Sequence, residues 1–140
     1  MDPRPSDEVL LGLARLVMDV SVRAAEELGD VSPVQLRALT VLRGAGAANL
    51  AQLADAMGVT VSTTSRLVDR LIAAGWVDRR QSPENRREVR LTLTGPGRAL
   101  LRRYDADRVT ALRDCLAHVP PERREAVAEA LDEFRHAAER

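Results

Sequence analysis

The chain has 140 residues, 45% of them apolar and 30% charged, a composition that excludes a disordered chain and fits one domain with helices that pair it with a second copy. Only 2% of the residues are aromatic, so a core has to be built from Leu, Val and Ala, which favours helices over a sandwich or barrel. The net charge is zero, but residues 43–103 contain eleven Arg and five acidic residues, and the flanks together carry a net −6. This uneven distribution predicts one surface suited to a polyanion.

The sequence also limits compartment and chemistry. No apolar run is long enough to cross a membrane, and residues 1–13 lack the basic segment and cleavage site of a signal peptide. Cys115 is the single cysteine, so we expect no disulfide framework and predict a cytoplasmic protein. There is no glycine-rich phosphate loop and no Ser-His-Asp or paired-carboxylate arrangement. We therefore expect no enzyme activity, no cofactor and no metal.

Two helices with defined ends are predicted first. Residues 6–28 carry apolar residues at helical spacing, and Gly29 follows as a C-terminal cap. Residues 32–35 (SPVQ) form a capping box with Pro33 at the first helical position. The second helix therefore begins at Pro33 and ends at the Gly-Ala-Gly sequence of residues 44–46.

A helix-turn-helix is predicted next. Asn49 and Gln52 form a second capping box for the short helix LAQLADAM, which ends at Gly58. Thr60 caps a further helix that ends at Gly75. Two short helices joined by a tight turn that contains glycine define this motif.

After Gly75 the spacing of the apolar residues changes from that of a helix to that of a strand. Residues 76–80 and 88–93 alternate apolar and polar side chains, and residues 82–86 (SPENR) carry turn signals, which predicts a β-hairpin with arginines at its tip. Thr94 caps the next helix, and Pro120-Pro121 ends it. The two last predicted helices cover residues 95–118 and 121–138.

The helix after Thr60 separates into two faces. Its apolar side consists of Val61, Thr64, Leu67, Val68, Leu71 and Ile72. Its polar side consists of Ser62, Thr63, Arg66, Asp69 and Arg70. Hydroxyl residues in the first turn can approach base edges in the major groove, Arg66 can bind guanine or phosphate, and Arg70 is better placed for the backbone. In isolation, this face is explained equally well as a solvated helix surface with an N-cap.

The predicted hairpin favours the DNA-binding interpretation. Arg86 and Arg87 lie at its tip, where a wing can reach the minor groove, whose narrow A·T-rich stretches attract arginine. Paired arginines at a loop tip alone would indicate only solubility. The helix, the wing and the basic middle segment together indicate a DNA-binding surface.

Residues 53–97 closely resemble the central part of the MarR family of winged helix-turn-helix regulators. They contain the family's Leu-Ala short helix, a Ser/Thr-rich recognition helix that ends in LVDRL, a Gly-Trp-Val start to the first strand, and a wing with arginine followed by Leu-Thr. The resemblance implies a fold that is mainly α with a small β-hairpin wing. It implies a winged helix-turn-helix over residues 31–97 and a helical dimerisation region formed by residues 1–30 and 98–140.

The resemblance also implies the residues that meet DNA. Ser62, Thr63, Ser65 and Arg66 would face bases or nearby phosphates, and Arg86 or Arg87 would be the wing residue. With the cap and the next turn included, the predicted DNA-binding residues are Thr60, Ser62, Thr63, Ser65, Arg66, Arg70, Arg86 and Arg87.

The same resemblance implies a sequence-specific transcriptional regulator. We expect a homodimeric repressor that binds a pseudo-palindromic operator in double-stranded DNA, with half-sites about 10 bp apart, and that is released by a small aromatic or anionic effector. Residues 9–20, 36–43 and 100–112 would line the effector site, where Tyr104 is the only aromatic residue. The alternative is a winged-helix protein-interaction module or a non-specific DNA-binding protein without effector control.

Two positions depart from the family pattern. Asn85 stands where the wing usually has Asp, so the ion pair that orients the wing arginine is replaced by a neutral hydrogen bond. Residues 94–97 read Thr-Gly-Pro-Gly instead of Thr-Pro-Ala-Gly, which predicts a looser start to the next helix and a swivel of the DNA-binding lobe.

The cysteine and the histidines suggest two other chemistries, and both are weaker than plain packing roles. Cys115 has no second cysteine to resolve a sulfenic acid, so we interpret it as a packing residue rather than a peroxide sensor. Cys115 and His118 have the spacing of two metal ligands, but His136 is the only other histidine, and two ligands are too few for structural zinc.

Overall fold

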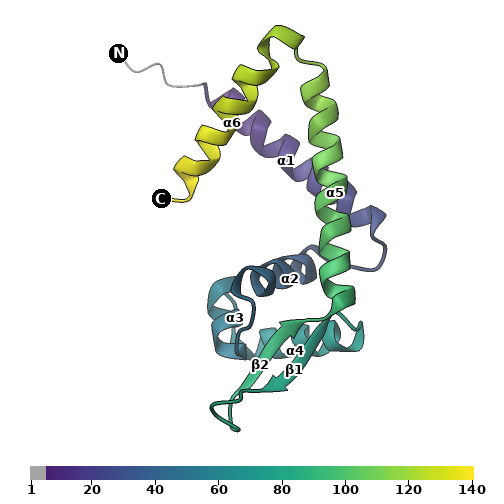
Figure 1. Ribbon diagram of the computed structural model, residues 1–140, viewed down its shortest axis with the longest axis vertical. Helices are drawn as coiled ribbons and strands as arrows, with labels where there is room; N and C mark the ends of the chain where they lie inside the picture. The colour runs from purple at the N-terminus through teal and green to yellow at the C-terminus, as the bar shows by residue number, and fades with distance from the viewer. Residues whose placement is uncertain (1–5) are drawn as a thin grey trace.

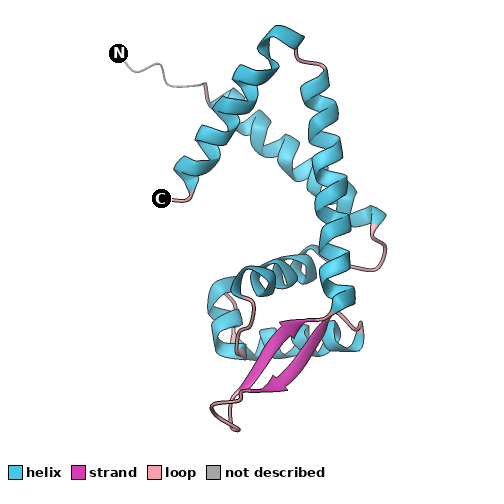
Figure 2. Cartoon of the chain, viewed as in Figure 1, coloured by secondary structure: helices cyan, strands magenta, loops and turns pink. Residues whose placement is uncertain are grey.

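The computed structural model describes residues 6–140. Residues 1–5, which belong to the predicted dimerisation region and to the segment assessed for a signal peptide, lie outside the described residues. Helices and one two-stranded hairpin make up the described chain (Figures 1 and 2), as the sequence predicted. The elements are α1 (Asp7–Glu27), α2 (Pro33–Ala45), α3 (Leu50–Met57), α4 (Val61–Ala73), β1 (Val77–Gln81), β2 (Val89–Leu93), α5 (Gly95–Ala117), the 3-10 turn η1 (Pro121–Arg123) and α6 (Arg124–Ala138).

The predicted caps set the helix ends. Ser32 Oγ accepts a hydrogen bond from the Gln35 N–H and Gln35 Oε1 accepts one from the Ser32 N–H, which starts α2. The same reciprocal pair starts α3. Helix α2 continues through Gly44 and ends one residue before Gly46, whose φ of 74° other residues rarely adopt.

The lower lobe in Figure 1 contains the helix-turn-helix and the hairpin. Its core is formed by leucines and valines from α2, α3, α4 and β1, with Leu39, Leu42, Leu53, Val68, Leu71 and Val77 almost completely buried. The hairpin is antiparallel, with Val77 opposite Leu93 and Gln81 opposite Val89. Ala48 exchanges two backbone hydrogen bonds with Leu91, which ties the segment before α3 to the sheet.

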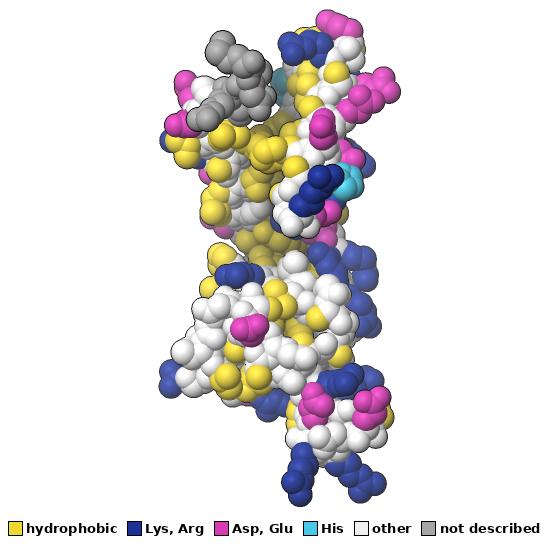
Figure 3. Space-filling model, turned by 90° about the vertical axis from the view of Figure 1, so that its left-hand side faces the viewer, with side chains coloured by type: hydrophobic (Ala, Val, Ile, Leu, Met, Phe, Trp, Pro, Cys, Tyr) yellow, Lys and Arg dark blue, Asp and Glu magenta, His cyan; other side chains and the backbone are white. Residues whose placement is uncertain are grey.

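The upper part consists of α1, the C-terminal half of α5 and α6, which turns back from the end of α5 (Figure 1). Helix α1 packs against α5, but few of its residues are buried, and none of α6 is. The three helices instead expose large apolar side chains: Val9, Leu10, Leu11, Leu16, Val17, Met18 and Val22 of α1, Val109 and Leu112 of α5, and Leu131 and Phe134 of α6. Figure 3 shows hydrophobic side chains gathered between these helices. Among the described residues, no helix is both long and apolar enough to cross a membrane.

Helix α5 joins the two parts through a closely packed start. Thr94 Oγ1 accepts a hydrogen bond from the Gly97 N–H and donates one to the Gly75 carbonyl at 2.6 Å. A Cβ at Gly97 would lie 2.2 Å from the Trp76 carbonyl oxygen, so only glycine fits there. The close packing is at Gly97, whereas a Cβ at Gly95, one of the residues that depart from the family pattern, would meet no atom within 4 Å. The helix start is capped by Thr94, and the swivel of the DNA-binding lobe stays a prediction.

Candidate nucleic-acid interface

Helix α4 buries one side against the lobe and exposes the other. Thr64, Leu67, Val68 and Leu71 are buried as predicted, and the Thr64 hydroxyl is satisfied by the Thr60 carbonyl at 2.9 Å. Val61, which the periodicity placed on the apolar side, is 50% exposed. Val61 lies on the same side of the helix as Thr64 and Val68, three and seven residues further on, but the core does not extend to the first turn, so Val61 is not buried.

The predicted polar residues of α4 lie where the periodicity placed them. Ser62, Thr63, Arg66 and Arg70 are exposed, and Ser65 is half-buried. Asp69, on the same side, pairs with Arg79 of β1 at 2.5 Å. Among the described residues, neither Arg66 nor Arg70 has an ion-pair partner, so the α4 arginines keep their charge available for an external anion.

Three hydroxyl groups form a cluster at the start of α4. Thr60 Oγ1 accepts from the Thr63 N–H at 3.2 Å, donates to Thr63 Oγ1 at 2.9 Å and lies 3.2 Å from Ser62 Oγ. A threonine hydroxyl has one proton and two acceptor positions, so Ser62 is the donor in the last contact and Thr60 has no capacity left. The Thr63 hydroxyl keeps its proton, and the Ser62 oxygen keeps acceptor positions. Thr60 thus acts as the helix cap, while Ser62 and Thr63 remain able to bind a base or a phosphate.

The wing projects beyond α4 at the same end of the molecule (Figures 1 and 3), and its Arg86 and Arg87 side chains are exposed. Asn85 Oδ1 accepts a hydrogen bond from the Arg87 backbone N–H at 3.1 Å. The neutral hydrogen bond expected at Asn85 thus goes to the backbone and shapes the turn, and it does not orient a guanidinium group. At the base of the wing, Asn49 Nδ2 donates to Glu88 Oε1 at 3.2 Å, which ties the loop to the start of α3.

A groove of about 480 Å³ lies between α1, α2 and α5 and overlaps the ranges that the sequence proposed for an effector, although Ser21, Val22, Ala25 and Pro33 of its lining lie outside them. Its lining includes Val17, Met18, Leu36, Tyr104 and Arg108. The Arg108 guanidinium lies 4.0 Å from the centre of the Tyr104 ring. Its Nε is buried and has no hydrogen-bond partner among the described residues.

Asp105 connects this groove to the lower lobe. It accepts hydrogen bonds from Arg108 of its own helix and from Arg43 of α2, the latter at 2.6 Å. Partial burial raises the pKa of Asp105, but the hydrogen bonds and positive charges of Arg108 and Arg43 outweigh it and hold the pKa below its ordinary value. The sequence reasoning did not identify this network, although the three-residue spacing of Asp105 and Arg108 on a helix was a signal for their pairing.

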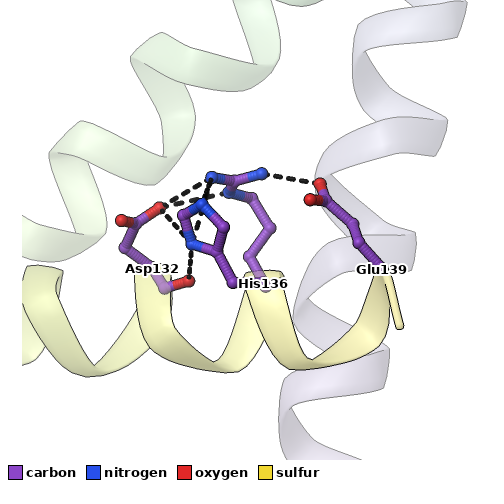
Figure 4. A network of polar contacts seen from close by, with 4 residues as sticks. Asp132, His136 and Glu139 are labelled. Atoms are coloured by element: carbon purple, nitrogen blue, oxygen red, sulfur yellow. Dashed lines mark hydrogen bonds and ion pairs between the residues drawn. The ribbon is translucent and has the colours of Figure 1, made fainter.

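The cysteine and histidines carry no metal-site geometry. Cys115 is exposed in the single chain, so the packing role expected from the sequence stays a prediction. Each histidine contacts the backbone carbonyl four residues before it, His118 that of Asp114 and His136 that of Asp132. Around His136, exposed side chains of α6 form a network in which Arg135 bridges Asp132 and Glu139 (Figure 4). The described residues contain no group of three potential metal ligands.

A short helix, a turn at left-handed Gly58, an exposed second helix and a two-stranded wing define a winged helix-turn-helix. The MarR family profile matches residues 31–89. The HTH-type transcriptional regulator YfiV of Bacillus subtilis is 33% identical over 110 residues, which are 79% of this chain and 69% of that protein. The crystal structure of RV1404 from Mycobacterium tuberculosis gives a TM-score of 0.84 at 32% identity, over 98% of this chain and 97% of that one. The chain therefore belongs to the MarR family of transcriptional regulators.

A protein whose structure was solved with bound DNA has the same fold. A single-residue mutant of MepR from S. aureus, bound to an oligodeoxyribonucleotide, has a TM-score of 0.76 at 16% identity, over 97% of this chain and 99% of that one. Family membership confirms the resemblance drawn from residues 53–97 and the mainly α fold class with a wing. Because the family consists of transcriptional regulators, the chain is a regulator and not an enzyme.

Proposed function

We propose that the chain is a sequence-specific repressor that binds a pseudo-palindromic operator as a homodimer. The observation that carries this proposal is the exposed face of α4, whose arginines have no acidic partner among the described residues, beside a wing tipped with Arg86 and Arg87. A neighbour of the same fold, MepR, is bound to an oligodeoxyribonucleotide in its structure, which supports DNA as the ligand.

Each predicted DNA-binding residue takes a role that its surroundings allow. Ser62 and Thr63 have hydrogen-bonding capacity left for base edges or phosphates, and Ser65 is half-buried beside them. Arg66 reaches a base and Arg70 the backbone, while the wing arginines enter the minor groove. Thr60 contributes by holding the first turn in place.

The homodimer follows from the apolar surface of the upper helices. An amphipathic helix such as α6, with Leu131 and Phe134 about half exposed and no buried residue, needs a partner to cover its apolar side. A second copy supplies the same surface through a two-fold axis and presents two α4 helices. We therefore assign dimerisation to residues 1–30 and 98–140 and DNA binding to residues 31–97.

Release by a small aromatic or anionic effector is the proposed control. The groove between α1, α2 and α5 offers Tyr104 for ring contact and the positive charge of Arg108 for an anion. Asp105 joins Arg108 to Arg43, so a ligand that competes for Arg108 would act on the contact between α5 and the lower lobe. A screen of aromatic carboxylates for thermal stabilisation and loss of DNA binding tests this part.

The test of the main proposal is capture of fragmented genomic DNA by the purified protein at physiological salt, followed by sequencing. The Arg86→Ala/Arg87→Ala variant runs beside it. We expect an inverted repeat that the wild-type protein retains and the double variant retains poorly. Uniform recovery without a motif would favour the non-specific binder or the protein-interaction module.

A further inference from the structure

Val61 is an exposed apolar side chain at the N-terminal end of the helix that the proposed function assigns to DNA. It occupies the first position of α4 and is 50% exposed. A single exposed valine is ordinary on a protein surface and indicates nothing alone. This one, however, stands directly between the cap Thr60 and the polar residues Ser62 and Thr63, at the end of the helix that enters the major groove in helix-turn-helix proteins.

The residues around Val61 favour an apolar contact as its role in binding. Thr60 has spent its hydrogen-bonding capacity within the cluster, so the surface on that side of Val61 offers little polar recognition. Val59, on the far side of Thr60, is also 40% exposed. In the major groove the one apolar group on a base edge is the 5-methyl group of thymine.

We propose that Val61 is a specificity-determining residue that packs against the 5-methyl group of one thymine in each half-site. The proposal rests on the function given above and names what the first turn of α4 reads. Arg66 lies five residues further on, about 7.5 Å along the helix axis, so Val61 and Arg66 would contact different positions of the operator.

The test removes only the methyl group. In the captured operator, each thymine is replaced in turn by deoxyuridine, symmetrically in both half-sites, and the Kd is measured by fluorescence anisotropy. Loss of one methyl contact weakens binding about fourfold, so the two half-sites of a dimer together give about fifteenfold. We expect one such position with the wild-type protein.

Variants of the protein then show whether Val61 contacts the sensitive thymine. Val61→Ala weakens binding to the thymine operator by a similar factor and is insensitive to deoxyuridine there, whereas Val61→Ile keeps the sensitivity. Val34, 55% exposed in the first turn of α2, supplies the matched control, because Val34→Ala leaves the profile unchanged. Since Val61 is not in the core, circular dichroism and melting should match the wild type.

Two results would overturn the proposal. If no thymine is sensitive in the wild type, or if the same sensitivity persists in Val61→Ala, then Val61 does not read a methyl group while operator binding still stands. If the wild-type protein does not distinguish the captured DNA from random duplex, both this proposal and the proposed function fail.

Discussion

Arg66 lies one turn after Ser62 on the exposed side of α4, and among the described residues it has no acidic partner. If it contacts a base edge, Arg66→Ala should cost about 1–3 kcal/mol of specific binding and relax the preference at one operator position. Arg66→Lys should not restore that preference, because lysine lacks the planar fork. Competition binding against single-position operator variants measures both effects. Equal weakening on every sequence would instead make Arg66 a phosphate contact.

Gly97 shows how a single residue holds the two parts of the molecule together. An added Cβ would collide with the Trp76 backbone, which cannot move as a flexible side chain would. Gly97→Ala should therefore lower the melting temperature clearly and weaken DNA binding. The matched change Gly44→Ala lies in helix α2 with no atom within 4 Å of the new Cβ, and it should be neutral or stabilising by up to about 1 kcal/mol. Equal melting temperatures for the two variants would contradict the close contact at Trp76.

At the scale of elements, Asp105 couples α5 to α2 through Arg43. Its pKa is lower in the folded protein than its ordinary value of 3.8, so its contribution to stability is complete above that value. The contribution is lost as the pH falls through the lowered folded pKa. The difference in free energy of unfolding between wild type and Asp105→Asn should therefore shrink in acid. Urea denaturation at fixed protein concentration over a pH series measures it, and a difference independent of pH would refute the pairing.

The elements themselves could largely be predicted from the sequence, because their end signals are local. Ser32 with Gln35, and Asn49 with Gln52, are capping boxes that can be recognised within four residues. Helical periodicity placed Val61 on the apolar side of α4, but it cannot show where the core ends, and the core ends before the first turn, which leaves Val61 half exposed.

Non-local contacts could not be predicted in this way. Arg43 and Asp105 are 62 residues apart, so no pattern in the sequence indicates that they meet. The exposed arginines of the candidate site were placed correctly by periodicity, whereas the saturation of Thr60 by its neighbours depends on side-chain geometry.

For the whole molecule, the apolar surface of α6 predicts that the chain is a dimer in solution. Phe134→Glu together with Leu131→Glu should convert it to a monomer, because the charges would have to be buried in the interface. Val34→Glu places a single glutamate at a valine that is as exposed as Phe134, 55% against 56%, and should leave the dimer intact. Light scattering with size-exclusion chromatography distinguishes the species. If the double variant is still a dimer, the interface does not include this surface of α6.

The proposed homodimer binds two half-sites at once. The most direct test of this is to measure its affinity for operators in which the spacing of the half-sites is altered. A homodimer with two α4 helices requires half-sites about 10 bp apart, centre to centre. An insertion of about half a turn, roughly 5 bp, places the second half-site on the opposite side of the duplex. We predict that affinity then falls to that of a single half-site. Unchanged affinity would contradict a dimer that reads two half-sites with its paired α4 helices.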